Sequence, residues 1–319
     1  MNTEVLCRTS PSLALVKYWG KKSSRKNLPA TPSLAVTLGG VQTETRVTIA
    51  EKDSIQLDGE AVAIDRFRPL FTALRKAAGR KVHFRAESVN DFPSSAGLAS
   101  SSSGLAALTV ACARVLELDL GPEDLSSLAR LGSASAARSL FGGFTLLPAG
   151  GTAARQLYGP EYWPQLRIVI ALVSHKAKPI SSRTAMEATR DTSPYYRAWL
   201  RNAAELLDPA LEALDKRDIE ALGTVARLSY SRMHAALLAA SPPLLYWLPA
   251  TVAVIRECRA LREDGLSAWE TLDAGPQVKV LCLESEVEAI SERLQRLDPA
   301  LKLIVASVGE GPVCESREL

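Results

Sequence analysis

The sequence has few cysteines and histidines, and neither type clusters. Its 319 residues include 5 cysteines and 3 histidines, and no Cys-x-x-Cys motif occurs. Structural zinc sites draw their ligands from close spacings, and disulfide frameworks usually use an even number of cysteines. We therefore expect neither a zinc site nor a disulfide framework, and cysteines that stay reduced, as in the cytoplasm.

The sequence also lacks a long apolar run and a signal-peptide pattern. The first residues, MNTEVLCRTS, show no basic segment followed by an apolar one. The longest apolar runs are shorter than the stretch of about 20 residues that a helix needs to cross a membrane. These absences favour a cytoplasmic protein with no membrane partner.

Charge of one sign is not in large excess. Lys and Arg number 38, Asp and Glu number 35, and the formal net charge is +3. The densest basic segment, KKSSRK at 21–26, is short, and we interpret it as a solvated loop. A nucleic-acid partner would require a broader basic surface, so we expect none. The 47% of hydrophobic and 23% of charged residues are instead typical of a globular protein.

Hydrophobic patterning predicts an α+β protein in two halves that meet near residue 165. Residues 41–50 alternate between polar and apolar types, as a half-buried strand does, and Asp-Gly within 54–64 predicts a hairpin. From residue 181 onward, most segments have apolar residues at helical spacing. The other predicted elements are helices at 66–79, 104–118, 193–218, 219–240 and 285–297, strands at 81–88 and 167–174, a strand-turn-strand unit at 269–283, and a last strand at 301–308.

The segment SVNDFPSSAGLASSSSGL, residues 88–105, places small residues and hydroxyls just before a nearly all-apolar helix. The first turn of a helix has N–H groups without internal partners and carries partial positive charge. Glycine and alanine would let a phosphate approach the backbone there, and serine hydroxyls could add donors or a magnesium ligand. The alternative is a helix cap followed by small residues that pack tightly. The sequence contains no Walker loop, GxGxxG dinucleotide loop or GxSxG elbow.

The pattern P-x-x-x-G-L-x-S-S at 93–101 resembles the phosphate loop of the GHMP kinase superfamily. Five segments are similar, in the same order along the chain, to those of the mevalonate diphosphate decarboxylase family. They are LALVKYWGKK (13–22), LPATPSLAVTL (28–38), SASAARSLFGGF (133–144), SSRTAMEATRDTSPYY (181–196) and TLDAGPQVKVL (271–281). Each motif alone is weak, but KYWGK, GLASS and DAGP together are very specific.

The resemblance implies a GHMP kinase-like two-domain α+β fold. A ribosomal protein S5-like, ATP-binding domain would occupy residues 1–164, and an α/β domain residues 165–319. The implied enzyme is an ATP-dependent carboxy-lyase of the mevalonate pathway of isoprenoid biosynthesis. It would phosphorylate the 3-hydroxyl of mevalonate 5-diphosphate and then release phosphate and CO2 to give isopentenyl diphosphate. ATP and Mg2+ would be required, and family members commonly form homodimers.

The resemblance also assigns roles to residues of this sequence. Asp273 would orient the 3-hydroxyl and accept its proton, Arg138 would bind the substrate carboxylate, and Lys21 would place positive charge near the ester phosphate. Further substrate contacts fall on Ser12, Tyr18, Ser133, Ser135, Ser139, Ser182 and Arg183. The ATP-binding positions are Ser95, Ala96, Gly97, Leu98, Ser100, Ser101, Ser102 and Ser103, with Ser101 as the magnesium ligand.

Several alternatives stay open at this point. Asp273 could serve only to stabilise a turn, and we interpret Trp19 as a core residue. Ser12 stands where the family usually has asparagine, and Pro32 and Ala185 also depart from the family pattern, which leaves the number of substrate phosphates open. The competing functions are a mevalonate 5-phosphate decarboxylase that gives isopentenyl phosphate, a 3-kinase that does not decarboxylate, and a non-catalytic binding protein with the GHMP fold.

Overall fold

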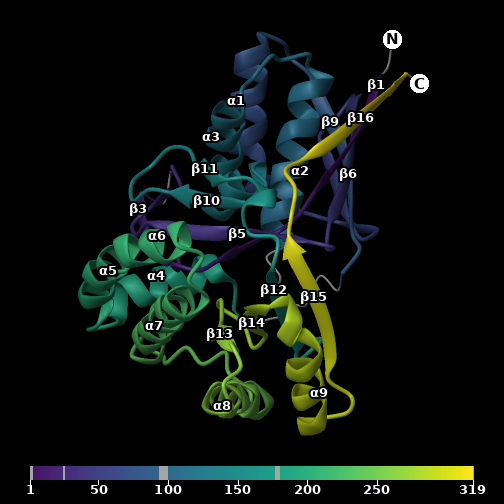
Figure 1. Ribbon diagram of the computed structural model, residues 1–319. Helices are drawn as coiled ribbons and strands as arrows, with labels where there is room; N and C mark the ends of the chain where they lie inside the picture. Colours follow the sequence, from purple (N-terminus) through teal and green to yellow (C-terminus); the bar gives the residue numbers. More distant parts are fainter. Residues whose placement is uncertain (1–2, 24–25, 93–99, 177–179, 319) are drawn as a thin grey trace.

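The computed structural model of the chain describes residues 3–23, 26–92, 100–176 and 180–318. Its framework is two large sheets and one small one, and helices cover the large sheets (Figure 1). Both chain ends lie together at the top of the N-terminal half, and most of the later helices lie at the other end (Figure 1). The small sheet pairs β3 (Lys21–Ser23) with β4 (Leu28–Pro29).

The first sheet belongs to the N-terminal half and also takes in the last described strand. Thr43 and Val47 are buried and Arg46 is exposed, which confirms the alternation predicted for 41–50. Asp58 and Gly59 both have positive φ, as the predicted Asp-Gly hairpin requires. The strands, in sheet order, are β16 (Val313–Glu318), β1 (Thr3–Thr9), β6 (Thr43–Ala50), β9 (His83–Asn90), β7 (Ser54–Leu57) and β8 (Glu60–Ala61).

Three helices pack against this sheet and form one core with it. Helix α1 ends where the sequence predicts, because Gly79 takes the left-handed conformation that closes a helix. Helix α2 begins inside the serine tract, before the predicted start at 104, and contacts β1 and β6. The bounds are α1 (Arg68–Ala78), α2 (Ser100–Val115) and α3 (Pro122–Gly132).

The second sheet joins strands from both halves of the chain. Strand β12 is buried on both faces, which explains its continuous apolar sequence. Ile168 and Ile170 pack with α6 and α7, whereas Val169 and Ala171 pack with α8 and α9. The strands, in sheet order, are β11 (Arg155–Tyr158), β10 (Phe144–Leu147), β5 (Ser33–Gly39), β15 (Lys302–Val308), β12 (Leu166–Leu172), β14 (Val278–Leu283) and β13 (Trp269–Thr271), and β2 (Ser12–Ala14) also pairs with β5.

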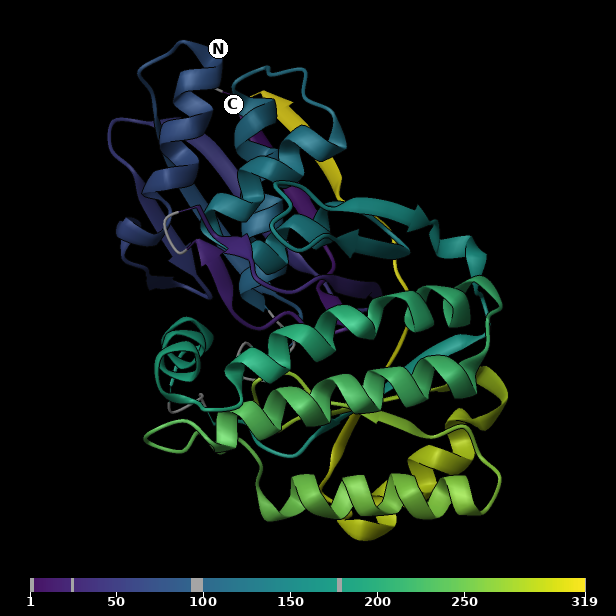
Figure 2. The same cartoon turned by 90° about the vertical axis from the view of Figure 1, so that its left-hand side faces the viewer.

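The helices of the second half follow the predicted positions with one break. The segment 193–218 forms two helices, because Pro209 cannot donate a helical hydrogen bond and takes its place in the first turn of α6. Figure 2 shows α7 as a long helix between the N-terminal half and α8. The bounds are α4 (Ser182–Thr192), α5 (Tyr196–Glu205), α6 (Leu207–Asp215), α7 (Ile219–Leu238), α8 (Pro249–Glu263) and α9 (Val287–Leu297).

Short 3-10 helices connect several of these elements. They are η1 (Ile64–Arg66), η2 (Ala134–Leu140), η3 (Pro160–Tyr162) and η4 (Glu284–Glu286). Two of them, η1 and η2, carry cationic residues of the site described below.

The C-terminal end corrects two expectations. The predicted last strand, 301–308, is β15, but β16 follows it and pairs antiparallel with β1. That pairing sets Cys7 opposite Cys314, and the two are joined by a disulfide. The expectation that no disulfide would form is therefore wrong. The two cysteines are 307 positions apart in the sequence, so no local spacing could predict the pair.

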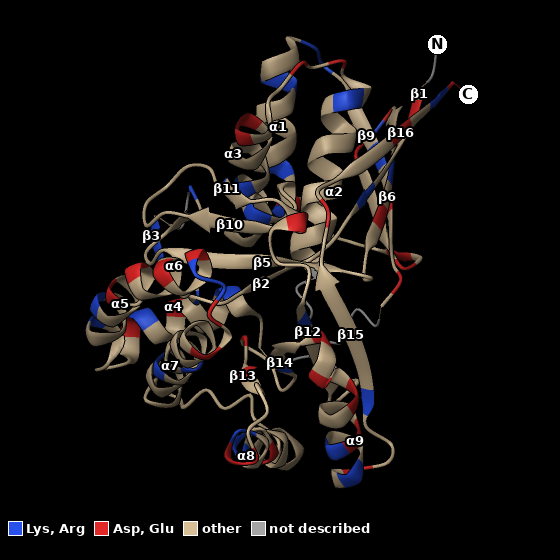
Figure 3. Cartoon of the chain, viewed as in Figure 1, with Lys and Arg blue, Asp and Glu red and all other residues tan. Residues whose placement is uncertain are grey.

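Charged residues of both signs are mixed over the two halves of the molecule (Figure 3). Within the described part of the chain, no helix is both long and apolar enough to cross a membrane. The described His, Cys, Asp and Glu side chains also form no group of three or more that could hold a metal ion.

Candidate active site

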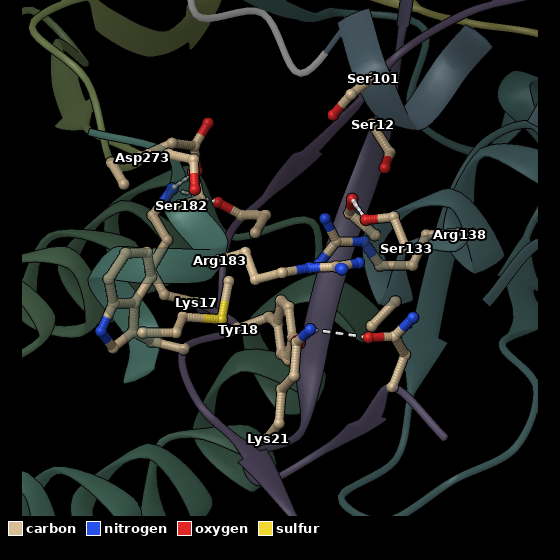
Figure 4. Close-up of a pocket in the computed structure, with 18 of the residues that line it drawn as sticks. Ser12, Lys17, Tyr18, Lys21, Ser101, Ser133, Arg138, Ser182, Arg183 and Asp273 are labelled. Atoms are coloured by element: carbon tan, nitrogen blue, oxygen red, sulfur yellow. Dashed lines mark hydrogen bonds and ion pairs between the residues drawn. The ribbon is translucent and has the colours of Figure 1, made fainter. Parts of the chain in front are cut away.

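A cavity of about 490 Å³ lies where the N-terminal half meets helices α4 and α7. This volume is in the range of about 300–1,000 Å³ that is typical of small-molecule sites. In Figure 4, Asp273 and Ser133 lie on opposite sides of the cavity, and Lys21 and Ser101 lie toward its two ends. The lining comes from segments far apart in the sequence, so the fold itself assembles the site.

Most of the predicted site residues line this one cavity. Asp273 after β13 and Ser101 at the start of α2 both face it, as the sequence reasoning required. The Ser133 and Ser135 hydroxyls lie 2.9 Å apart on its wall. The predicted residues in the lining are Ser12, Tyr18, Lys21, Ser101, Ser133, Ser135, Arg138, Ser182, Arg183 and Asp273.

Three predicted contacts lie behind the cavity wall. Ser102 and Ser103 are buried, and the Ser103 hydroxyl lies 2.6 Å from that of Thr43 in β6, so Ser103 links α2 to the sheet. Ser139 is buried too, and its hydroxyl donates to the Ser12 hydroxyl at 3.3 Å. Its effect on a ligand would therefore pass through Ser12. The remaining ATP-binding positions lie outside the described side chains: Ser95, Ala96, Gly97, Leu98 and Ser100.

Asp273 meets two buried lysines. Lys17 Nζ donates to Oδ1 of Asp273 at 2.9 Å, and Lys279 Nζ lies 3.4 Å from Oδ2. The Lys17 and Lys279 side chains are 1% and 2% exposed, whereas that of Asp273 is 28% exposed. Buried ammonium groups need a charged or hydrogen-bonding partner. Asp273 provides one and still presents an open edge to the cavity.

The three charges set one another's ionisation. Burial alone would raise the pKa of Asp273, but Lys17, then Lys279 and Arg138, outweigh burial and hold that pKa well below its usual range. Burial lowers the pKa of Lys17 to about 8, against the pull of Asp273. At neutral pH the pair is therefore an ionised carboxylate beside a mostly protonated lysine.

Neither of these lysines was among the site residues predicted from the sequence. Lys17 had a usable signal, because it is the one charged residue in the apolar run LALVKYW at 13–19. A lysine inside a segment that must be buried requires a partner of opposite charge. Lys279 alternates with apolar residues in β14 and reads as an outward-facing position, although the second sheet buries both faces there.

Arg138 is a buried cation with unused donor capacity. It lies in η2 and is 4% exposed, and its guanidinium donates to the Ser33 hydroxyl. Its Nε is buried with no hydrogen-bond partner among the described residues. Burial lowers the pKa of Arg138 to about 10, while Asp273 pulls that pKa up, so it stays charged at neutral pH. A buried guanidinium with a free donor is suited to bind a carboxylate or phosphate.

A second group of cations lies at the Lys21 end of the cavity. Lys21 Nζ donates to Asn27 Oδ1 at 2.7 Å, and Arg183 and Arg66 lie close enough to affect its ionisation. Burial, then Arg183 and Arg66, lower the pKa of Lys21 to about 8, against the pull of Glu187. Burial and Arg183 likewise lower the pKa of Arg66.

Nothing in the sequence singles out Arg66, which is an ordinary basic residue at the start of the predicted helix 66–79. With it, five cationic side chains and one carboxylate line the described cavity wall: Lys17, Lys21, Arg66, Arg138, Arg183 and Asp273. This excess of positive charge favours an anionic ligand with several charges.

The KYWGK segment is held in place by aromatic packing. Trp19 is 2% exposed within a core cluster, which confirms its predicted packing role, and its carbonyl accepts from Trp199 Nε1 at 2.9 Å. Gly20 has φ +104°, and a Cβ there would collide with the Tyr196 hydroxyl. The hydroxyl of Tyr18 is buried without a hydrogen-bond partner among the described residues, and burial raises its pKa. Tyr18 therefore has an O–H that a ligand could engage.

The cavity also suits a nucleotide with magnesium. Ser101 is exposed in the first turn of α2 and lines the cavity. The first turn of a helix has backbone N–H groups without helical partners, which suit a phosphate. The carboxylate in the described lining, Asp273, is already paired with two lysines, so it is poorly placed to ligate a cation as well. A magnesium ion would then take most of its ligands from phosphates and water, with the Ser101 hydroxyl as a protein ligand.

Comparison with known proteins places these features in one family. The model of the diphosphomevalonate decarboxylase-like N-terminal domain matches residues 9–157, and that of the mevalonate 5-diphosphate decarboxylase C-terminal domain matches residues 168–314. A diphosphomevalonate decarboxylase of Schizosaccharomyces pombe is 32% identical over 95% of this chain and 84% of its own length.

Solved structures agree with this match over nearly the whole chain. One described as MDDEF in complex with MVAPP, AMPPCP and magnesium has a TM-score of 0.92 and 34% identity, covering 99% of this chain and 100% of its own. The mevalonate diphosphate decarboxylase of Staphylococcus aureus has a TM-score of 0.92 and 33% identity, with coverages of 99% and 98%. The chain belongs to the diphosphomevalonate decarboxylase family.

Proposed function

We propose that this protein catalyses the ATP-dependent decarboxylation of mevalonate 5-diphosphate to isopentenyl diphosphate. The observation that carries the proposal is the joint placement of the Lys17–Asp273 pair and the buried, partly unpaired Arg138 in one strongly cationic cavity. The family supports it, because the similar protein MDDEF was solved with MVAPP, AMPPCP and magnesium.

Each end of the substrate has a matching group in the cavity. The carboxylate of the substrate would pair with Arg138, whose Nε still lacks a partner among the described residues. The 3-hydroxyl would donate to the open edge of Asp273, which is the part of that carboxylate left by Lys17 and Lys279. The phosphate end would lie against Lys21, Arg66, Arg183 and the Tyr18 hydroxyl.

Bound MgATP would supply the phosphoryl group, and its magnesium ion would offset the negative charge of the phosphates. Asp273 orients the 3-hydroxyl and accepts its proton as the oxygen forms its bond to phosphorus. Because its pKa is low, Asp273 is a weak base, and we expect the proton to reach it only when that bond is well advanced. Lys17, beside the same carboxylate, then stabilises the negative charge that develops on the transferred group.

Loss of CO2 depends on the relative positions of two charged groups of the intermediate, the 3-phosphate and the carboxylate. When the 3-phosphate leaves, it takes the C–O electron pair, and the pair from the C–C bond to the carboxylate forms the new double bond. Arg138 holds the carboxylate in one direction, so that the C–C bond can align with the departing group. The cations at the cavity receive the phosphate, whose charge increases as it leaves.

The number of cations favours the diphosphate over the monophosphate. Lys21, Arg66 and Arg183 together exceed what one phosphate needs, and the Tyr18 hydroxyl adds a further donor. The intact Lys17–Asp273 pair disfavours a non-catalytic binding protein. Such a protein would not need a buried lysine held against an open carboxylate.

The direct test offers the purified protein ATP together with mevalonate, its 5-phosphate or its 5-diphosphate in separate reactions. CO2 release and ADP formation are measured in the same samples. We expect equal amounts of both products with the 5-diphosphate and much slower turnover with the other two. Turnover only with the 5-phosphate would name the alternative decarboxylase, ADP without CO2 would indicate a kinase, and no turnover with any substrate would contradict the proposal.

We also infer a cytoplasmic homodimer. The helical half exposes apolar side chains on α7, α8 and the segment between them, which would be covered by a second copy: Leu228, Leu238, Leu245, Leu248 and Val252. The need for ATP supports the cytoplasm, but the Cys7–Cys314 disulfide is unusual there. Sedimentation of the purified chain tests the dimer.

A further inference from the structure

Helix α7 holds the backbone at both members of the Lys17–Asp273 pair. The Ser229 hydroxyl accepts the backbone N–H of Lys17 at 2.8 Å, and both groups are buried. Five residues further along the same helix, His234 Nε2 lies 3.2 Å from the backbone carbonyl oxygen of Asp273. One helix thus fixes the two chain segments that carry the ion pair, although they lie 256 residues apart in sequence.

The contact with Asp273 fixes the protonation of His234. A carbonyl oxygen can only accept a hydrogen bond, so Nε2 must carry the hydrogen and donate it. His234 is 2% exposed, and burial lowers its pKa to about 4 despite the hydrogen bond to Asp273. The charged groups that face it are Lys17, Lys279 and the Asp273 carboxylate, and the rings of Tyr230 and Trp247 pack beside it. It is therefore a neutral donor at working pH.

The turn that carries Asp273 is anchored on both sides. The Asp273 carbonyl also accepts the N–H of Gly275 at 2.8 Å, so this oxygen has two donors. At the other end of the turn, the Thr251 hydroxyl of α8 donates to the Pro276 carbonyl at 2.7 Å. Removing the His234 donor would leave the Asp273 carbonyl with only the Gly275 donor, which belongs to the turn itself.

We propose that His234 is a positioning residue. Its Nε2–H, donated to the backbone of Asp273, keeps the carboxylate between Lys17 and Lys279 with its open edge toward the substrate hydroxyl. Ser229 does the same for the Lys17 backbone from the same helix. This inference rests on the proposed function, in which the Asp273 carboxylate orients the 3-hydroxyl. A displacement of about 1 Å at such a group can cost about 100-fold in rate.

Two variants of nearly equal size separate the donor from the packing. Gln can place an amide N–H near the position of Nε2, whereas Met fills similar space without a donor. We expect His234→Met to lower kcat about 10- to 100-fold with little change in the KM for ATP, and His234→Gln to stay within about 5-fold of wild type. Equal rates in the two variants would overturn the proposal, because packing alone would then explain the site.

The pH dependence of kcat gives a second comparison of these variants, which a change in packing alone would not affect. A carboxylate that moves away from Lys17, Lys279 and Arg138 has a higher pKa, so the acid limb of kcat in His234→Met should move to higher pH. In His234→Gln it should stay in place. An unmoved limb in His234→Met would contradict the positioning role.

The second contact of α7, at Ser229, keeps the proposal testable if His234→Met does not fold. Ser229→Ala removes the acceptor for the Lys17 N–H, and Ser229→Thr keeps a hydroxyl there. We expect Ser229→Ala to lower kcat about 10-fold and Ser229→Thr to recover most of it. Equal kcat values for wild type and Ser229→Ala would show that Ser229 does not position Lys17 for catalysis.

A spectroscopic measurement does not depend on turnover. The chain has 3 histidines, and comparison with His234→Gln identifies the signal of His234 in protein labelled with 15N-histidine. We expect the neutral Nε2–H form from pH 8 down to pH 5. The Nδ1–H form would refute the hydrogen bond itself, and a charged ring would contradict the neutral state of the donor. Wild-type protein that shows this form but releases no CO2 would instead contradict the proposed function.

Discussion

At the scale of single residues, the two lysines of the KYWGK motif have similar pKa values but different partners. Burial lowers the pKa of both Lys17 and Lys21 to about 8. Lys17 is paired with the carboxylate of Asp273, whereas Lys21 donates to the neutral amide of Asn27. A phosphate on the substrate would give Lys21 the anionic partner it lacks, but would change the surroundings of Lys17 much less.

This difference predicts separate effects on the pH dependence. A lysine loses its charge as pH rises through its pKa, so we expect kcat/KM to fall above about pH 8. The bound phosphate raises the pKa of Lys21, and the basic limb that remains in kcat then belongs to Lys17. In Lys21→Met the KM for the mevalonate ester should rise while the basic limb of kcat stays. Loss of that limb in Lys21→Met would contradict the assignment.

The candidate site was partly predictable from residues. Asp273, Arg138 and Lys21 lie in motifs, and the fold brings all three to one cavity. Lys17 could have been predicted from its apolar surroundings. Arg66 and Lys279 could not, because a basic residue at the start of a predicted helix and a polar residue in an alternating strand are ordinary features. Their roles depend on which chain segments pack against them.

At the element scale, the position of α7 depends on one close approach to the second sheet. A Cβ at Gly223 of α7 would collide with the ring of Trp269 in β13. Gly104 of α2 is also inside a helix, but a Cβ there would meet Thr43 Cγ2 at 3.7 Å, an ordinary contact. Close packing therefore requires glycine at position 223 but not at position 104.

Alanine at these two positions should have different effects on stability. We expect Gly223→Ala to lower the free energy of unfolding by about 1–3 kcal/mol, because the helix must shift away from Trp269. Gly104→Ala should leave that free energy unchanged or raise it by up to about 1 kcal/mol through helix propensity. Denaturant melts of both variants decide this. A Gly223→Ala protein as stable as wild type would show that α7 can move without cost.

Most elements were predictable because they depend on local patterns. The 41–50 strand, the Asp-Gly hairpin and the helix closed by Gly79 follow from periodicity and turn residues. The break between α5 and α6 was also within reach, since Pro209 marks it. Strand β16 was missed, because its residues are largely exposed and its pairing with β1 is entirely non-local.

At the scale of the whole molecule, the last two strands pair with strands of the N-terminal half. Strand β15 pairs with β5 of the N-terminal half, and β16 pairs with β1. Local patterns could not predict this, because both pairings join distant segments. The division into residues 1–164 and 165–319 stays a prediction, and these two strand pairs cross it.

The disulfide between β1 and β16 can be tested by counting reactive thiols. Protein purified without reductant and denatured should show three reactive thiols, from Cys112, Cys258 and Cys282, and five after reduction. Cys314→Ser should lower the free energy of unfolding by about 2–4 kcal/mol relative to oxidised wild type, and added reductant should remove the difference. Five thiols before reduction would mean that Cys7 and Cys314 are not joined.

The central claim is that one carboxylate, Asp273, carries the chemistry in a cavity built for a multiply charged anion. The most direct measurement compares wild type and Asp273→Asn in a single turnover with ATP and mevalonate 5-diphosphate, following ADP and CO2 together. A melting curve of each protein controls for folding. We predict that the rate falls by about 100- to 10,000-fold in Asp273→Asn while the Kd for ATP stays within about 3-fold. A folded Asp273→Asn protein that forms both products within about 10-fold of the wild-type rate would contradict the claim.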